Sequence, residues 1–470
     1  MQESRTQVLV LGGGPGGYAA AFAAADHGLS VTLVDGAENP GGVCLYEGCI
    51  PSKALLHAAG VLREAEDAAR IGISFAAPTV DIDRLRTWKR GVVDRLTRGL
   101  GTLTRQRKIT YVQGRGAFLD SGSVKVEMQG GTEQRIYFEQ AIVATGSQAF
   151  FPPNFPRKSE RIMDAGGALE LPDVPTRLLV VGGGYIGTEM ATIYSALGSK
   201  VTLVELTPTL LPGMDPDLVK VLAPRLQKSV EGILLETRVA SMEETKNAVR
   251  VRLERAGQTT EAEFDRVLVS VGRVPNTGSI GLDKAGVTLT ERGFVKVDEE
   301  RRTSNRAIFA IGDVTGAPML AHKASREGKV AANVIAGRTD RYMPLAVPAV
   351  VYTDPELAWA GLTEAEAKAQ GRSVKVSTFP WSASGRAMTI DRPEGVTKLV
   401  VDERTGEVLG MGIAGHGAGD LIAEGVLAVE MQATAGDIGL MIHPHPTFAE
   451  TILEAAEAAE GHATHFLGRR

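Results

Sequence analysis

Two cysteines, Cys44 and Cys49, are the residues whose type and spacing most directly indicate chemistry in this chain. They are the only cysteines among 470 residues, and they lie in the run GGVCLYEGCIPSK. A disulfide across so short a loop would remove only about 2 kcal/mol of chain entropy, so it would be a weak structural crosslink. A zinc site would have only His57 nearby to complete it, and inert thiols are the remaining alternative. The spacing favours a redox-active disulfide.

A second group with catalytic potential lies near the carboxyl terminus, in the run HPHPTFAE from His443 to Glu450. Only the thiolate attacks a disulfide, and a thiol with a pKa near 8.5 is mostly protonated at neutral pH. His445 could serve as the base, and Glu450 could fix its tautomer. The residues alone leave three interpretations open, namely a rigid proline-containing loop, a catalytic base and a metal ligand.

The pattern Gly-x-Gly-x-x-Gly occurs twice in contexts typical of dinucleotide binding. Because glycine makes up about 12% of the chain, the bare pattern is expected about once by chance. Both copies, however, follow a predicted strand and open an Ala-rich helix, and an acidic residue ends the next strand at the same distance. Such turns let the backbone approach a pyrophosphate while the acid binds ribose hydroxyls. We therefore expect two bound dinucleotides, at Gly12, Gly14, Gly17 and Asp35 and at Gly182, Gly184, Gly187 and Glu205.

Glu205 also bears on the choice of nicotinamide cofactor. A carboxylate at this position repels a 2′-phosphate, and the next residues, Leu206 and Thr207, supply no arginine to hold one. The sequence therefore favours NAD over NADP.

The composition excludes several classes of protein. Hydrophobic residues make up 43% of the chain and charged residues 23%, which argues against wholesale disorder. The net charge of −5 argues against a nucleic-acid partner, and we assign the arginine-rich helix expected over 82–103 a solvated basic face. No apolar run approaches the ~20 residues of a membrane span or forms a signal-peptide core. We expect a cytoplasmic protein with no membrane partner.

The order of predicted elements indicates a duplicated α/β design. Strands are expected at 7–11, 31–35, 178–181 and 201–205, with a helix at 18–27 after the first glycine turn and another after the second. From about residue 346, short β-rich runs alternate with turn residues and two Ala-rich helical stretches follow, which is typical of a separate α+β domain.

Taken together, these motifs resemble the flavin-linked pyridine nucleotide–disulfide oxidoreductases over essentially the whole chain. The resemblance rests on the cysteine run, both glycine turns, ATGS at 144–147, TSNRAIFAIGDV at 303–314 and HPHPTFAE at 443–450. It implies two Rossmann-like domains and a carboxy-terminal α+β dimerisation domain. The implied boundaries are 1–148 for FAD binding, 149–275 for NAD binding, 276–345 for a central domain completing the FAD site, and 346–470 for dimerisation.

The resemblance also implies cofactor contacts. Cys49 would lie against the flavin, Cys44 would exchange with substrate, and Lys53 and Glu189 would pair beside the flavin. Asp313 is expected to end a strand and hold the ribityl chain. The FAD contacts implied are Gly12, Gly14, Gly17, Asp35, Gly42, Cys44, Lys53, Gly116, Thr145, Gly146, Asp313 and Ala321. The NAD contacts implied are Gly182, Gly183, Gly184, Tyr185, Ile186, Gly187, Glu205, Val239 and Gly272.

Activity and partners follow from the same resemblance. The closest pattern within the family is that of the members that oxidise protein-bound dihydrolipoyl groups with reduction of NAD⁺. In that pattern His445 is the catalytic base and Glu450 is the carboxylate that orients it. The two act on the disulfide of the other subunit, which implies a homodimer. The lipoyl domains and the acyltransferase core of a 2-oxoacid dehydrogenase complex would be the protein partners, and no metal is expected.

Overall fold

The amino-terminal glycine turn joins the central strand of the first sheet to a helix. In the computed structural model, which describes residues 2–128, 130–157 and 159–467, β1 runs from Gln2 to Leu11 and α1 from Pro15 to Asp26. Val8, Leu9, Val10 and Leu11 are all buried, as expected for a parallel strand covered on both faces. The sheet also contains β2 (Val31–Asp35), β3 (Thr110–Asp120), β4 (Ser123–Met128), β5 (Glu133–Val143) and β16 (Ile308–Ala310).

The second sheet repeats this design. All its pairings are parallel, and α6 (Tyr185–Ala196) follows its central strand as α1 follows β1. Its strands, in spatial order, are β10 (Gly232–Leu234), β9 (Lys200–Val204), β8 (Arg177–Val181), β14 (Arg266–Val269) and β7 (Ile162–Met163). Two antiparallel pieces accompany it: β11 (Arg238–Glu244), β12 (Val249–Arg255) and β13 (Gln258–Phe264), and the pair β6 (Ser147–Ala149) and β15 (Arg273–Pro275).

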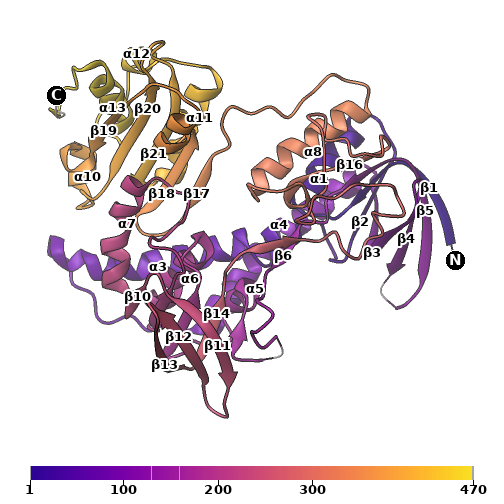
Figure 1. Ribbon diagram of the computed structural model, residues 1–470, viewed down its shortest axis with the longest axis horizontal. Coiled ribbons are helices and arrows are strands. Elements are labelled where there is room, and N and C mark those ends of the chain that lie inside the picture. The colour runs from indigo at the N-terminus through magenta and orange to yellow at the C-terminus, as the bar shows by residue number, and fades with distance from the viewer. Residues whose placement is uncertain (1, 129, 158, 468–470) are drawn as a thin grey trace.

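The carboxy-terminal part forms an antiparallel sheet covered by helices, separate from the other two sheets in Figure 1. Trp381 anchors its core and is fully buried, because Gly395 and Gly415 leave room for the indole ring. The strands, in spatial order, are β17 (Ala349–Val351), β18 (Glu356–Gly361), β21 (Val408–Gly415), β20 (Val396–Asp402) and β19 (Val374–Pro380). The helices are α9 (Glu364–Ala369), α10 (Gly385–Thr389), α11 (Ala418–Glu430), α12 (Ala435–Gly439) and α13 (Glu450–Glu460).

The remaining helices connect these layers. α8 packs closely on α1, because Gly328 lets its backbone approach Gly16. α3 packs against both α6, which follows the central strand of the second sheet, and α4. Figure 1 shows α3 beside α6. The bounds are α2 (Gly42–Tyr46), α3 (Cys49–Asp67), α4 (Ile82–Gln106), α5 (Ala165–Leu169), α7 (Pro216–Ser229) and α8 (Ala321–Ile335).

Helix α4 contains the expected apolar repeat, but several of its apolar residues face solvent. Trp88, Leu96 and Leu103 are each at least 40% exposed. The buried positions are instead Lys89, Val93, Thr97, Gly101 and Thr104, whose mostly small side chains let the helix approach its neighbours. Periodicity located the helix and did not identify its buried face.

Among the described residues, no helix is long and apolar enough to cross a membrane.

Candidate functional site

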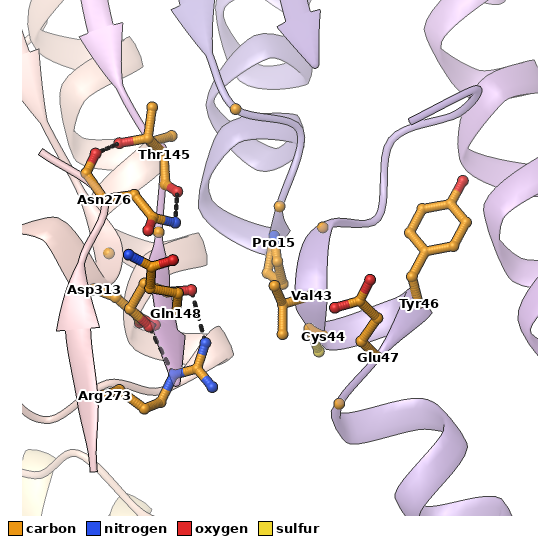
Figure 2. Close-up of a pocket in the computed structure, with 18 of the residues that line it drawn as sticks. Pro15, Val43, Cys44, Tyr46, Glu47, Thr145, Gln148, Arg273, Asn276 and Asp313 are labelled. Carbon is orange, nitrogen blue, oxygen red and sulfur yellow. Dashed lines mark hydrogen bonds between the residues drawn. The ribbon is translucent and has the colours of Figure 1, made fainter. Parts of the chain in front are cut away.

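A cavity of about 1250 Å³ is lined on one side by residues of the first sheet and on another by residues of α5 and α6, the helices that accompany the second sheet. This exceeds the ~300–1,000 Å³ typical of drug-sized ligand pockets and suits a larger molecule such as a dinucleotide. In Figure 2, Pro15, Val43 and Cys44 face Asp313 and Arg273 across it. Of the twelve residues expected to contact FAD, eleven line the cavity: Gly12, Gly14, Asp35, Gly42, Cys44, Lys53, Gly116, Thr145, Gly146, Asp313 and Ala321.

The twelfth residue, Gly17, does not line the cavity but allows the close packing of the glycine turn. A Cβ atom there would lie 1.8 Å from the Gly12 carbonyl oxygen, so only glycine allows α1 to approach β1 this closely. Gly12 has φ of +103°, and a Cβ atom on it would lie 2.2 Å from the Ala144 oxygen. α1 begins after Gly14 without a side-chain cap, which leaves its first N–H groups available for a phosphate.

Asp35 follows the same plan at the end of β2. Its carboxylate accepts hydrogen bonds from the N–H groups of Gly13 at 2.5 Å and Ala37 at 2.9 Å. A carboxylate has about four acceptor positions, so capacity remains for ribose hydroxyls. The first turn therefore fits the adenosine and pyrophosphate of FAD.

The second glycine turn reproduces this geometry. A Cβ atom on Gly187 would lie 1.8 Å from the Gly182 oxygen, and Gly182 has φ of +106°. The Glu205 carboxylate accepts from the N–H groups of Gly183 at 2.6 Å and Thr207 at 2.8 Å. The match to the first turn indicates the same type of ligand.

The residues expected to contact NAD divide into two groups. Tyr185 and Ile186 line the cavity together with Glu189. The others lie outside its lining, at or near the carboxyl edge of the second sheet: Gly182, Gly183, Gly184, Gly187, Glu205, Val239 and Gly272.

The two cysteines line the cavity as free thiols. Cys44 lies on α2, and Cys49 is the first residue of the 19-residue helix α3, where the helix dipole favours an anion. A hydrogen bond from Cys44 and the nearby Lys53 ammonium lower the pKa of Cys49 to about 7, against the opposing effect of burial. The same hydrogen bond, together with burial, raises the pKa of Cys44. Of the two sulfurs, Cys49 is the one whose surroundings favour the thiolate.

Lys53 and Glu189 form the ion pair that the family resemblance implies. The Lys53 Nζ atom lies 2.8 Å from Glu189 Oε2 and 3.0 Å from Oε1. Glu189 is 4% exposed, so its charge depends on this partner. Both side chains line the cavity beside Cys49.

His445 and Glu450 also pair, away from the cavity of their own chain. The His445 Nδ1 atom lies 2.8 Å from Glu450 Oε1, and Oε2 accepts the Thr447 N–H at 2.7 Å. Burial works to raise the pKa of Glu450, but these two donors hold it below its usual value. The imidazole is 75% exposed and contributes nothing to the cavity lining.

His443, by contrast, is nearly buried and pairs with Glu424 at 2.9 Å. No group of three or more potential metal ligands occurs within the described ranges.

The surroundings of Asp313 differ from one expectation and include Arg273, a residue that the sequence did not point to. Asp313 does not end a strand, since β16 ends at Ala310 and Asp313 lies in a 3₁₀ turn from Gly312 to Thr315. Its Oδ2 atom accepts from Ser147 Oγ at 2.5 Å, and Ser147 Oγ accepts from Arg273 Nε at 2.7 Å.

Asn276, which lines the same cavity, is a second residue that the sequence did not point to. Asn276 donates to the Thr145 carbonyl at 2.9 Å, and Thr145 Oγ1 donates to the Asn276 carbonyl at the same distance (Figure 2). Both missed residues belong to the run GRVPN at 272–276, which directly follows a predicted NAD contact, Gly272, and could have been singled out on that ground.

Comparison with known proteins agrees with this geometry. Residues 6–328 match the family model of pyridine nucleotide-disulphide oxidoreductases, and residues 347–456 match the dimerisation domain of that family. The chain belongs to the pyridine nucleotide-disulphide oxidoreductases. This confirms the resemblance and the α/β fold class.

Relatives of known name and structure extend the comparison. The chain is 46% identical over 464 residues to a dihydrolipoyl dehydrogenase from Vibrio cholerae, covering 98% of this chain and 97% of that protein. Among solved structures, LpdA from Mycobacterium tuberculosis is similar with a TM-score of 0.89 and 27% identity, covering 96% of this chain and 99% of LpdA. The flavoprotein disulfide reductase RclA from Escherichia coli matches with a TM-score of 0.85, 27% identity and coverage of 96% and 99%.

Proposed function

We propose that this protein is a dihydrolipoyl dehydrogenase, which reoxidises protein-bound dihydrolipoamide through a Cys44–Cys49 disulfide with FAD and NAD⁺. One observation carries the proposal: the cysteine pair lines a dinucleotide-sized cavity, with Cys49 at a helix N-terminus beside the Lys53–Glu189 ion pair. The 46% identity to a named dihydrolipoyl dehydrogenase supports this choice within the family.

The chain's own residues would hold both cofactors. The turn at Gly12, Gly14 and Gly17 and the Asp35 carboxylate would hold the adenosine diphosphate half of FAD, and Asp313 would hold the ribityl chain. When bound, FAD accepts the electron pair of the reduced cysteines and delivers it to NAD⁺ as hydride.

Glu205 would select the nicotinamide cofactor. Its carboxylate is fixed by two backbone N–H groups at the end of β9 and is 7% exposed, so a 2′-phosphate would meet a buried negative charge. NAD⁺ is therefore the acceptor.

Thiol exchange would proceed at Cys44. A dihydrolipoyl thiolate attacks Cys44 Sγ, which breaks the Cys44–Cys49 bond, forms a mixed disulfide and leaves Cys49 as the thiolate. The second substrate thiol then attacks the substrate sulfur of the mixed disulfide, which releases Cys44 and forms the lipoyl disulfide. Two electrons pass from the substrate to the cysteine pair in these steps.

His445 would take the proton of the first substrate thiol at Nε2. Glu450 accepts only, so the hydrogen on Nδ1 points to it and the Nε2 lone pair is free. Because His445 does not reach the cavity of its own chain, we infer that it serves the cavity of a second copy in a homodimer. The family's dimerisation domain supports this inference.

Lipoyl domains and the acyltransferase core of a 2-oxoacid dehydrogenase complex are the partners that this activity requires, and the cytoplasm is the compartment in which we place it.

Single cysteine substitutions test the thiol mechanism. C44S and C49S are each expected to lower the rate of dihydrolipoamide oxidation by at least about 10³-fold, because the Cys44–Cys49 disulfide that oxidises the substrate can no longer form. Reduction of ferricyanide by NADH, which needs no cysteine, should persist in both variants. Full dihydrolipoamide turnover by C44S would refute the mechanism.

Mixed dimers test the contribution of His445 from the second copy. A heterodimer of C44S with H445Q holds one intact pair of Cys44 and His445 only if the pair is formed between chains. We expect about half the activity of the wild-type dimer, whereas both parent homodimers should be inactive. An inactive heterodimer would show that His445 acts within its own chain.

A further inference from the structure

Tyr352 lies where three separate parts of the chain meet. It follows β17 of the carboxy-terminal sheet, whereas Lys53 comes from α3 and Glu189 from α6. The Lys53 Nζ atom lies 4.4 Å from the centre of the Tyr352 ring, within the range of a cation–π contact. The Tyr352 N–H donates to Glu189 Oε1 at 3.0 Å. One residue therefore contacts both members of the Lys53–Glu189 pair.

The Tyr352 ring is held in place by its own neighbours. Gly419, near the start of α11, has no side chain, and a Cβ atom there would lie 3.4 Å from Tyr352 Cε1. The Gly419 N–H donates to Glu356 Oε2 at 2.8 Å, which fixes this end of α11 against β18. The edge of the ring therefore lies against Gly419, and Tyr352 as a whole is 37% exposed.

We propose that Tyr352 is a positioning residue that holds the Lys53 ammonium against Glu189 and beside Cys49. The inference rests on the proposed function, in which Cys49 carries the thiolate. Lys53 is 34% exposed and has a long, flexible side chain. The ring covers one face of the ammonium, which opposes the rotation of Lys53 into solvent.

The charges around Cys49 give the sign of the effect. Lys53 lowers the pKa of Cys49 and Glu189 raises it. Cys44, Tyr18, Tyr185 and Tyr352 also interact electrostatically with Cys49, and Glu356 interacts with Lys53. Since Lys53 is the cation of this group, its movement toward water weakens the attraction for the thiolate and raises the pKa of Cys49.

The experiment is a pH titration of the long-wavelength thiolate-to-flavin absorbance band in the two-electron-reduced holoenzyme. In Y352L, which removes the ring, the midpoint should rise by about 0.5–1 pH unit, the size expected for a partly exposed cation–π contact. At the wild-type midpoint the thiolate fraction then falls from half to about 10–25%. Y352F keeps the ring and should titrate like the wild type.

Tyr137 offers a matched control. Its ring faces Arg135 at 4.7 Å in the first sheet, so Y137L removes the same kind of contact away from the cysteines. It should leave the midpoint unchanged. An unchanged midpoint in Y352L, with a normal band in the wild type, would overturn the positioning role of Tyr352. Absence of the band in the wild type would overturn the proposed function, and the inference with it.

A graded series covers the case in which Y352L does not fold. Phenylalanine with increasing fluorination at position 352 keeps the shape of the ring and weakens its negative face. The midpoint should rise with each added fluorine. A midpoint that stays constant along the series would overturn the proposal.

Discussion

Replacing Glu450 by glutamine separates the tautomer-fixing role of this residue from its bulk. In the native pair, one carboxylate oxygen accepts from His445 Nδ1 at 2.8 Å and the other accepts the Thr447 N–H at 2.7 Å. In E450Q the amide oxygen keeps the bond to Thr447, so the amide NH₂ faces Nδ1. The Nδ1 atom must then accept, the ring hydrogen moves to Nε2, and Nε2 can no longer take a proton from the substrate.

The expected loss is that of a positioned general base, about 10²–10⁴-fold in kcat/KM for dihydrolipoamide, or about 3–5 kcal/mol of transition-state stabilisation. The assay is NADH formation from dihydrolipoamide. Ferricyanide reduction by NADH, which needs no thiol base, should change less than about twofold.

Glu454 supplies a matched control on the same helix, since it pairs with His465 Nδ1 at 2.5 Å one turn after Glu450. E454Q makes the same chemical change in a pair that the mechanism does not use, and it should lower kcat/KM less than about threefold. A loss below about fivefold in E450Q, or an equal loss in E454Q, would refute the role given to Glu450.

Three further predictions concern the buried carboxylate of Glu327, the carboxylate of Glu205 at the second glycine turn and the thiol of Cys49. E327A removes a fully buried carboxylate that pairs with Arg301 at 3.0 Å and Lys323 at 3.1 Å, so it should lower the free energy of unfolding in urea by about 3–5 kcal/mol; an unchanged urea midpoint would contradict this. E205A should raise the KM for NAD⁺ about tenfold, because two hydrogen bonds to the ribose are lost. It should also narrow the preference for NAD⁺ over NADP⁺, because the charge that repels the 2′-phosphate is lost. Steady-state kinetics with both cofactors measure the two effects. The pKa of Cys49, lowered to about 7, makes it mostly thiol at pH 6 and mostly thiolate at pH 8, so its alkylation by iodoacetamide in the reduced protein should rise about tenfold between these values and then level off; a rate that keeps rising to pH 9 would contradict the assignment.

Local patterns in the sequence predicted the parts of the site that depend on backbone geometry. The strand at 31–35 matches β2, and both glycine turns open helices as expected. Such turns are predictable because only glycine allows the approach of Gly17 to Gly12, and because the acid at the end of the next strand follows in register. The Lys53–Glu189 pair came instead from the family resemblance, since nothing local joins residues 136 positions apart.

The contacts that the sequence did not predict are those between distant segments. Arg273 reaches Ser147 across the β6–β15 pair. Tyr352, which follows β17, contacts Lys53 on helix α3. No periodicity encodes these contacts, because they depend on how completed sheets and helices pack. The same limit explains α4, where mostly small side chains, and not the apolar repeat, form the buried face.

An anaerobic titration of the purified protein with NADH, followed by visible absorbance, tests the central claim most directly. We expect a yellow protein that develops the long-wavelength thiolate-to-flavin band after two electrons, because Cys49 carries a thiolate against the bound flavin. Bleaching of the flavin without that band would show that the cysteine pair is not coupled to it, and would contradict the account.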